Sequence, residues 1–162
     1  MAYYDDIADG YEELHEEEQM KKIDVVKKYL KVSKDERLLD VGRGIGITTL
    51  PWDCERHGID SSSRLLEKAR EKGKINYKLA PAEKIPYPDG FFDIVISITA
   101  LQNFDDIEKG LREIKRVGKG KFVLSFLKKS PKREAIDRLI RKNFNVSKII
   151  EEDKDVIYFA SQ

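Results

Sequence analysis

Three glycines at every second position, Gly42, Gly44 and Gly46, follow a short apolar run that contains one acid, Asp40. Because glycine has no Cβ, such a turn can bend tightly and let the backbone approach a ligand closely. The spacing is G-x-G-x-G and not the G-x-G-x-x-G of dinucleotide-binding turns. A carboxylate two residues before the first glycine suits a cationic ligand better than a phosphate. The alternative is a glycine-rich turn of some other α/β domain.

A second acid, Asp60, ends the predicted strand over residues 56–60, and it stands 18 residues after Gly42. Dinucleotide sites place an acid about 20 residues after the glycines, where it binds ribose hydroxyls. A carboxylate accepts two hydrogen bonds, and a vicinal diol offers two donors. Asp60 is therefore expected to bind a ribose. The alternative is a helix N-cap, because residues 60–63 are all capping types.

Hydrophobic patterning predicts the elements that position these residues. Strands are expected over 38–41, 56–60, 75–79, 91–98 and 121–127, and helices over 16–31, 64–72, 105–117 and 131–144. The last two strands, 146–150 and 156–160, flank a short polar turn and should form an antiparallel hairpin. The expected fold class is α/β, with a mostly parallel seven-stranded sheet.

Composition limits the classes of protein that fit this chain. Its 162 residues suit one domain. Charged residues make up 38%, against about 25% in typical proteins, which is consistent with a thermophilic source. Cys54 is the single cysteine, and no Cys/His cluster suggests a metal site. No apolar stretch approaches the roughly 20 residues that span a bilayer, and no signal peptide is evident, so we expect a cytoplasmic protein without membrane contact.

Charge is unevenly spread along the chain although the net charge is only +1. Residues 5–18 contain eight acids and no Lys or Arg, whereas residues 109–142 contain thirteen Lys or Arg and three acids. A charge run usually marks a solvated face. The size of this asymmetry keeps an anionic partner such as RNA as an alternative.

Residues 38–46 resemble motif I of the class I (Rossmann-like) S-adenosylmethionine-dependent methyltransferases. The pattern Tyr-Asp-x-Ile-Ala-x-x-Tyr at residues 4–11 resembles the ubiquinone-biosynthesis-type (methyltransferase-11-like) branch. The loop over 81–87 is similar to the family's Asp-Ala-Glu-x-Leu-Pro-Phe loop, which holds the adenine. The resemblance implies a Rossmann-like three-layer sandwich over 1–162, with an N-terminal helical lid over 1–31 and a core over 37–162.

The resemblance also implies the cofactor, S-adenosylmethionine, and a set of residues around it. The expected cofactor-binding residues are Tyr11, Asp40, Gly42, Gly44, Gly46, Asp60, Ser61, Ala82, Glu83 and Ser97. Residues 99–104 leave the carboxyl end of a central strand, where open α/β sheets bind ligands, so Leu101, Gln102 and Asn103 are expected to face the substrate. The chain departs from the family at Arg43 in the glycine turn and at Pro81, where the adenine-binding acid is usual.

The expected reaction is methyl transfer by in-line displacement to an acceptor that is a small molecule, an RNA or a protein. Such a transfer depends mainly on alignment and needs a base only when the nucleophile is protonated. No catalytic base is predicted. His15 in the lid is the alternative, while His57 and Trp52 are expected to be structural. The other readings are a nicotinamide-dependent oxidoreductase and a non-catalytic or partner-dependent subunit that binds S-adenosylmethionine or RNA.

Overall fold

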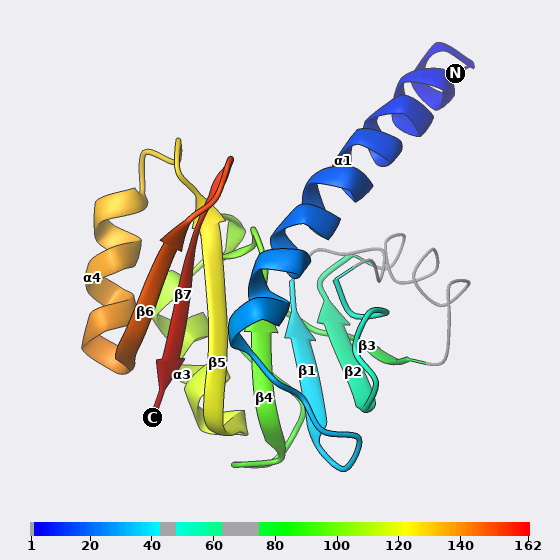
Figure 1. Cartoon of the computed structure of the whole chain (residues 1–162). Coiled ribbons are helices and arrows are strands. Elements are labelled where there is room, and N and C mark those ends of the chain that lie inside the picture. Colours follow the sequence, from blue (N-terminus) through cyan, green and yellow to red (C-terminus); the bar gives the residue numbers. More distant parts are fainter. Residues whose placement is uncertain (1, 43–47, 63–74) are drawn as a thin grey trace.

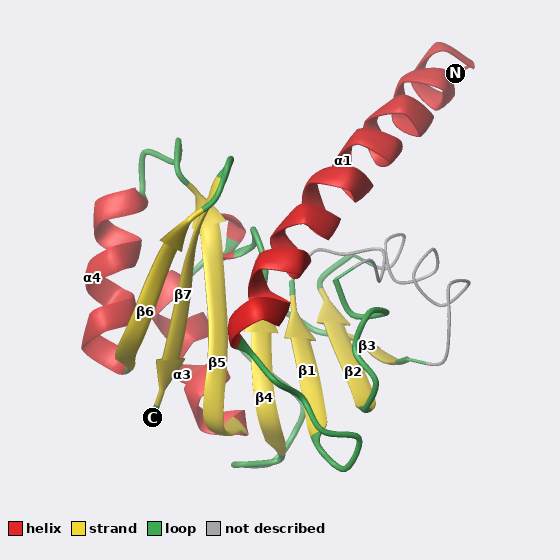
Figure 2. Ribbon diagram, in the orientation of Figure 1, coloured by secondary structure: helices red, strands yellow, loops and turns green. Residues whose placement is uncertain are grey.

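The computed structural model describes residues 2–42, 48–62 and 75–162, and for residues 2–13 the backbone alone. Seven strands form one sheet in the order β3-β2-β1-β4-β5-β7-β6 (Figure 1 and Figure 2). Their bounds are β1 Arg37–Val41, β2 Glu55–Asp60, β3 Asn76–Leu79, β4 Phe92–Ser97, β5 Gly118–Leu127, β6 Asn145–Glu151 and β7 Asp155–Ser161. The first five strands are parallel, and β7 runs antiparallel to both β5 and β6. The predicted fold class and hairpin are confirmed.

The described helices are α1 Ala2–Tyr29, the 3₁₀ turn η1 Leu101–Asn103, α3 Ile107–Val117 and α4 Arg133–Asn143. Asp106 is the N-cap of α3, and its side chain accepts a bond from Lys109 N at 3.1 Å. The predicted helix over 64–72 lies outside the described residues. The helix predicted over 16–31 is longer than expected, since α1 begins at Ala2 and extends beyond the edge of the sheet (Figure 1).

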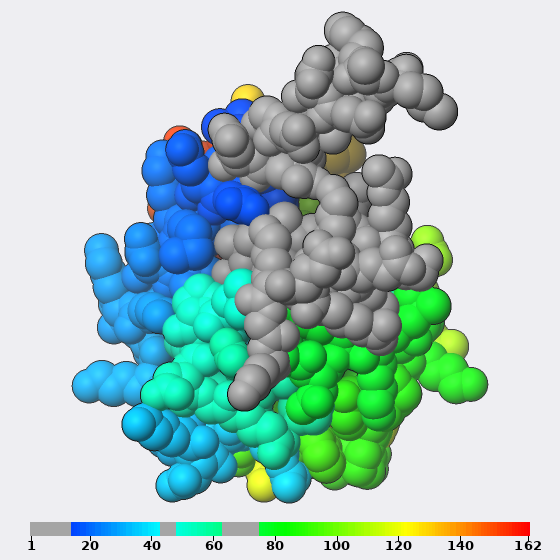
Figure 3. Space-filling view, turned by 90° about the vertical axis from the view of Figure 1, so that its right-hand side faces the viewer, coloured from blue at the N-terminus to red at the C-terminus, as the bar shows by residue number. Residues whose placement is uncertain are grey.

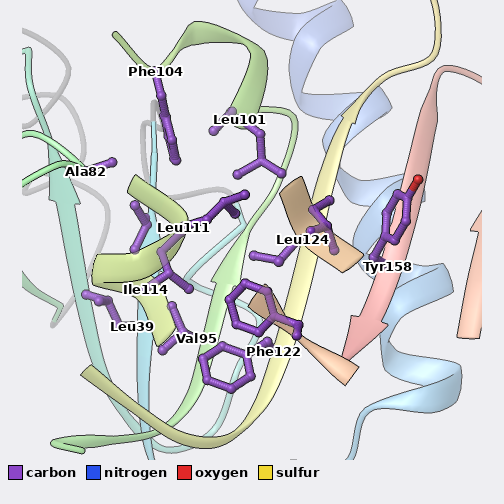
Figure 4. Close-up of a cluster of buried hydrophobic side chains, with 14 of the residues drawn as sticks. Leu39, Ala82, Val95, Leu101, Phe104, Leu111, Ile114, Phe122, Leu124 and Tyr158 are labelled. Atoms are coloured by element: carbon purple, nitrogen blue, oxygen red, sulfur yellow. The ribbon is translucent and has the colours of Figure 1, made fainter. Parts of the chain in front are cut away.

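The sheet separates two apolar clusters, which gives three layers. On one face, Ile23 and Val26 of α1, together with Leu30 just after the helix, pack on side chains from β1, β4, β5 and β7. On the other face, α3 and α4 cover a larger cluster, part of which Figure 4 shows. Neighbouring residues Leu38 and Leu39 belong to opposite clusters, because successive side chains of a strand point to opposite faces.

Contacts at one end of α1 fix it to the segment that follows the glycine turn. Lys27 Nζ donates to the carbonyl of Pro51 at 2.8 Å and lies 5.4 Å from the ring centre of Trp52. Trp52 is buried, and its indole N–H donates to the carbonyl of Thr48 at 2.9 Å. Figure 3 shows this face, with the blue residues of α1 beside the cyan residues 48–62. The expected structural role of Trp52 is confirmed.

His57 is also structural. It is buried in β2, with Nδ1 3.0 Å from the Tyr87 hydroxyl and Nε2 2.9 Å from a Glu55 carboxylate oxygen. The rings of Tyr87, Phe91 and Phe92 surround it at centroid distances of 5.3 to 5.9 Å.

Among the described residues, no helix is both long and apolar enough to cross a membrane.

Candidate cofactor site

A cavity of about 230 Å³ opens at the carboxyl ends of β1, β2 and β4. β1 and β4 are neighbours in the sheet, and the strand order reverses between them, so the cavity lies at the switch point where open α/β sheets bind ligands. Its described lining is Val41, Gly42, Ile59, Asp60, Ser61, Ala80, Ala82, Ala100, Asn103 and Phe104. The structure therefore brings together Gly42, Asp60, Ser61, Ala82 and Asn103 from the predicted set.

Gly42 ends β1 in a conformation that side chains disfavour. Its φ is +154°, and a Cβ built on it would lie 2.8 Å from the Cβ of Ala100. Its N–H donates to the carbonyl of Ile59 at 3.2 Å, which ties the turn to β2. A close approach between two backbone segments explains why glycine stands here. Gly44, Gly46 and Arg43 lie outside the described residues.

Asp60 ends β2 and lies at the cavity wall with only 4% of its surface exposed. Its Oδ1 accepts a bond from Ser62 N at 2.8 Å, and its backbone carbonyl accepts one from Ala80 N at 2.9 Å. This local bond is the kind that the alternative required, but the helix that Asp60 would cap lies outside the described residues. The bond coexists with a position at the cavity, because a carboxylate has capacity for several hydrogen bonds.

Asp40 does not line this cavity. Its Oδ2 accepts bonds from the hydroxyls of Thr48 and Thr49, and the carboxylate is buried. Burial raises the pKa of Asp40 to about 6, and the two threonine bonds oppose that rise. Asp40 lines instead a void of about 10 Å³ beside Asp60, which is far too small for a cofactor.

The rest of the cavity wall is mainly apolar. Small side chains of Ala80, Ala82 and Ala100 line it together with the ring of Phe104. The ring of Phe104 lies over Gly110 of α3, where an added Cβ would meet it at 2.5 Å. A wall of small residues closed by one aromatic ring suits a flat apolar group.

Two further predicted cofactor residues make protein contacts away from the cavity. Glu83 accepts a bond from Asp106 N at 3.0 Å and so supports the start of α3. Ser97 is fully buried, and its hydroxyl donates to the carbonyl of Val41 at 2.6 Å. Ser97 thereby holds β4 against β1 at the point where the glycine turn begins.

The predicted substrate-facing residues divide into three situations. Leu101 is fully buried in the cluster beneath α3, so the expectation that it faces a substrate is corrected (Figure 4). Gln102 donates from Nε2 to the carbonyl of Thr99 at 3.0 Å, while its Oε1 is buried without a partner among the described residues. Asn103 is exposed and lines the cavity.

The N-terminal predictions concern α1. Tyr11 lies in the helix, but its side chain is outside what the structure describes. His15 is half-buried on the same helix. The binding of a cofactor by Tyr11 and the role of His15 as a base stay predictions.

Sequence reasoning missed several residues that shape the site. Thr48 and Thr49 hold Asp40. Ala100 and Phe104 belong to the segment 99–104 that was expected to face the substrate, but they had no separate role assigned, and they form part of the cavity wall. Thr48 and Thr49 stand eight and nine positions after Asp40, and two hydroxyl side chains so close in sequence to a buried acid could have been predicted as its hydrogen-bond donors. The place of Ala100 and Phe104 after the central strand was the signal for these two residues.

Comparison with known proteins identifies the family. Residues 39–124, just over half of the chain, match the model of the methyltransferase domain. The methyltransferase YcgJ of Bacillus subtilis is 37% identical over 101 residues, which cover 56% of this chain and 40% of that protein. The ubiquinone/menaquinone biosynthesis C-methyltransferase UbiE of Geotalea daltonii is 33% identical over 103 residues, covering 56% of this chain and 44% of that protein. The chain thus matches less than half the length of these relatives.

Solved structures show the same fold over most of the chain. A SAM-dependent methyltransferase from Aquifex aeolicus aligns with a TM-score of 0.72 at 20% identity and covers 86% of this chain and 88% of that one. A chain of the complex between the Haloferax volcanii Trm112 methyltransferase activator and a methyltransferase aligns with a TM-score of 0.78 at 16% identity, covering 95% and 94%. From its motif, its sheet and these matches, this chain belongs to the methyltransferase-domain family, in the class I, S-adenosylmethionine-dependent branch that its sequence resembles.

Proposed function

We propose that this chain transfers the methyl group of S-adenosylmethionine to an acceptor. The observation that carries the proposal is the cavity at the β1–β4 switch point, where a buried acid, a glycine turn and an apolar wall meet. Family membership supplies the reaction class, and the cavity supplies a place for the cofactor in this chain.

The described residues fit an adenosyl group. Asp60 would hold the ribose hydroxyls, and the wall of Ala80, Ala82 and Phe104 would hold the flat adenine. When bound, S-adenosylmethionine supplies a methyl group that its sulfonium has already activated. Asp40 is a buried carboxylate that is largely ionised at neutral pH, and it favours a cationic ligand through its field.

The protein's part in catalysis is then orientation. Holding an acceptor in line with the methyl–sulfur bond can contribute roughly 7–11 kcal/mol to lowering the barrier. Asn103 lines the cavity and offers an amide that can position an acceptor, although an amide does not act as a base near neutral pH. The geometry therefore suits a nucleophile that is already unprotonated near neutral pH.

We propose a small-molecule acceptor in the cytoplasm. The single cysteine, Cys54, supports a reducing compartment. The relatives differ in the atom that their names give as methylated: UbiE is named a C-methyltransferase, whereas ajmaline N-methyltransferase of Rauvolfia serpentina is 36% identical over 95 residues. Relatives of similar identity thus carry names with different accepting atoms, so the match supports the cofactor and the reaction class and does not identify the accepting atom.

The second candidate is a partner-dependent or non-catalytic subunit. The observation that favours it is the likeness to a chain from the Haloferax volcanii activator complex, together with Arg43 and Pro81 in the cofactor loops. Cofactor binding that needs a second protein, or binding without any methyl transfer, would distinguish this candidate.

Calorimetric titration with S-adenosylmethionine and S-adenosylhomocysteine tests the main proposal. We expect saturable binding that Asp60→Asn weakens by about tenfold or more, because the variant keeps an acceptor for Ser62 N but loses the charge facing the diol. The matched control is Asp53→Asn, since Asp53 is highly exposed and is not among the residues that line the cavity. Absence of heat at millimolar ligand would end the proposal. A labelled-methyl screen of candidate acceptors then follows.

A further inference from the structure

An ion pair is buried between α1 and the β6–β7 hairpin. Lys22 and Asp155 expose only 2% and 0% of their side chains, and Lys22 Nζ lies 3.1 Å from Asp155 Oδ1. Lys22 also donates to Gln19 Oε1 and to Thr99 Oγ1, each at 2.8 Å. A lysine is almost never fully buried unless it is paired. Its position therefore depends on partners from three separate parts of the chain.

Thr99, which joins this ion pair to the candidate site, has an uncommon backbone. It follows β4 with a φ of +55°, a left-handed conformation that is an outlier for a β-branched residue. Such strain persists only where the surroundings over-determine it. Here Thr99 Oγ1 donates to Asp155 Oδ2 at 2.6 Å, and Thr99 N donates to Ser125 Oγ at 2.8 Å. Ser125 Oγ donates in turn to Asp155 Oδ2 at 2.7 Å.

The turn at Thr99 places the residues that follow it. Ala100 comes to lie so close to Gly42 that only glycine fits there, and both residues line the cavity. Gln102 donates back to the Thr99 carbonyl and so holds η1 against the turn. Asn103, at the end of η1, lines the same cavity. A relaxed Thr99 backbone would move this wall.

We propose that Lys22, Asp155 and Thr99 are positioning residues that make ligand binding in the cavity depend on the docking of α1. The inference rests on the proposed function insofar as S-adenosyl ligands occupy the cavity. Docked α1 presents the Lys22 ammonium, which with Asp155 fixes the Thr99 hydroxyl and thereby the cavity wall. Undocked α1 leaves Asp155 buried without its cation and removes one of the three constraints on Thr99.

Thr99→Val tests the proposal because valine keeps the shape and the β-branch but loses the hydroxyl contacts to Lys22, Asp155 and Gln19. Thr99→Ser is the conservative variant and keeps them. A second test variant, Lys22→Met with Asp155→Asn, removes both charges together, since deleting one alone strands a buried charge. The matched control is Lys154→Met. Lys154 pairs with Glu18 at 2.9 Å and so also joins α1 to the hairpin, but the pair is partly exposed and does not touch Thr99.

Two measurements apply to each variant: hydrogen exchange of residues 99–104, and the Kd for S-adenosylhomocysteine. In Thr99→Val and in the double variant, we expect exchange and Kd both to rise by about tenfold, which lies within the range for coupled sites. Thr99→Ser and Lys154→Met should match the wild type in both. If the variant with both Lys22→Met and Asp155→Asn fails to fold, Thr99→Val alone tests the proposal, because its ion pair between Lys22 and Asp155 is intact.

Three outcomes separate the possibilities. Lowered melting temperature with unchanged exchange and unchanged Kd would overturn the proposal, because the network would then only add stability. Equal effects of Lys154→Met and of the double variant would overturn it as well, since any contact of α1 with the hairpin would then suffice. If the wild type binds no S-adenosylhomocysteine, the proposed function fails, and the exchange of residues 99–104 alone decides the positioning role.

Discussion

Asp40 is buried beside the candidate cofactor site, and its ionised carboxylate lowers the free energy of unfolding. Burial of the carboxylate raises its pKa to about 6 despite two bonds from Thr48 and Thr49. The unfolded chain has the ordinary, lower pKa, so between about pH 4 and 6 the folded state holds a proton that the unfolded state has lost. Stability therefore falls as pH rises through this window and stays reduced above it.

Asp40→Asn should stabilise the protein at neutral pH. With each pKa unit equal to about 1.4 kcal/mol, we expect a gain in the free energy of unfolding of about 2–3 kcal/mol near pH 7.5 and almost none near pH 4. Urea unfolding of both proteins at the two pH values measures the difference. Asp53→Asn, at an exposed position, serves as the control. A less stable Asp40→Asn protein at pH 7.5 would show that the ionised carboxylate has a partner that compensates for its burial.

Gly42→Ala should lower the free energy of unfolding through a steric clash with Ala100, and Ala100→Gly should relieve part of that clash. The new Cβ would lie 2.8 Å from the Cβ of Ala100, closer than real side chains approach. We expect a loss of about 2–3 kcal/mol and weaker S-adenosylhomocysteine binding, with Ala100→Gly restoring part of the stability of Gly42→Ala. The backbone strain at a φ of +154° remains in the double variant, so the rescue is incomplete. Independent, additive effects of the two changes would contradict this contact.

At the scale of elements, α3 carries the aromatic wall of the cavity. Gly110 lies inside this helix, where glycine costs about 1 kcal/mol relative to alanine. The ring of Phe104 occupies the space that a side chain would need. Gly110 thus lowers the intrinsic stability of α3 but leaves room for the ring of Phe104, which lines the cavity.

Gly110→Ala should therefore lower ligand affinity although it favours helix formation. The added Cβ would meet the Phe104 ring at 2.5 Å and displace it toward the cavity. We expect S-adenosylhomocysteine to bind about tenfold more weakly, an effect of the size that small displacements produce in packed sites. Gly120→Ala is the matched control, because no atom lies within 4 Å of a Cβ built there. Titration calorimetry of both variants gives the comparison, and equal affinities would exclude this role of Gly110.

The elements were largely predictable because they depend on local patterns. The strands, α3 and the hairpin all follow from apolar spacing and short turns, whereas the choice of Asp106 over Asp105 as the cap of α3 came from the structure. The start of α1 at Ala2 did not follow, since the residues before Glu16 lack the apolar spacing that marks a helix packed on a sheet. Leu101 could not be assigned either, because an apolar residue after a strand can face a ligand or the core. The ion pair of Lys22 and Asp155 joins residues 133 positions apart, which no local pattern can reveal.

Across the whole molecule, charge is more evenly balanced than the sequence suggested. At least seven of the thirteen cations between residues 109 and 142 pair with carboxylates: Arg112, Arg116, Lys119, Lys121, Arg133, Arg141 and Lys142. A cation held by a carboxylate of its own chain is less available to a phosphate. The basic segment is thus mainly a surface network of ion pairs.

Binding to RNA should accordingly be weak and sensitive to salt. We expect a Kd weaker than about 1 µM for a structured RNA near 150 mM salt, and a steep further loss as salt rises, as for non-specific association. Fluorescence anisotropy with a labelled transfer RNA at several salt concentrations provides the measurement. A salt concentration of 300 mM is on the order of twice the cellular value. RNA binding that stays tight at this concentration would instead support RNA as the methyl acceptor.

The buried pair of Lys22 and Asp155 has a consequence for the growing chain on the ribosome. Lys22 is synthesised 133 residues before its counter-ion, a delay on the order of ten seconds at typical elongation rates. Until β7 emerges and pairs between β5 and β6, the α1 ammonium has no carboxylate in the sheet to receive it. A nascent protein that stalls before Asp155 could still pack α1 on Trp52, β1 and β4, but Lys22 would lack its buried counter-ion until translation had passed that codon.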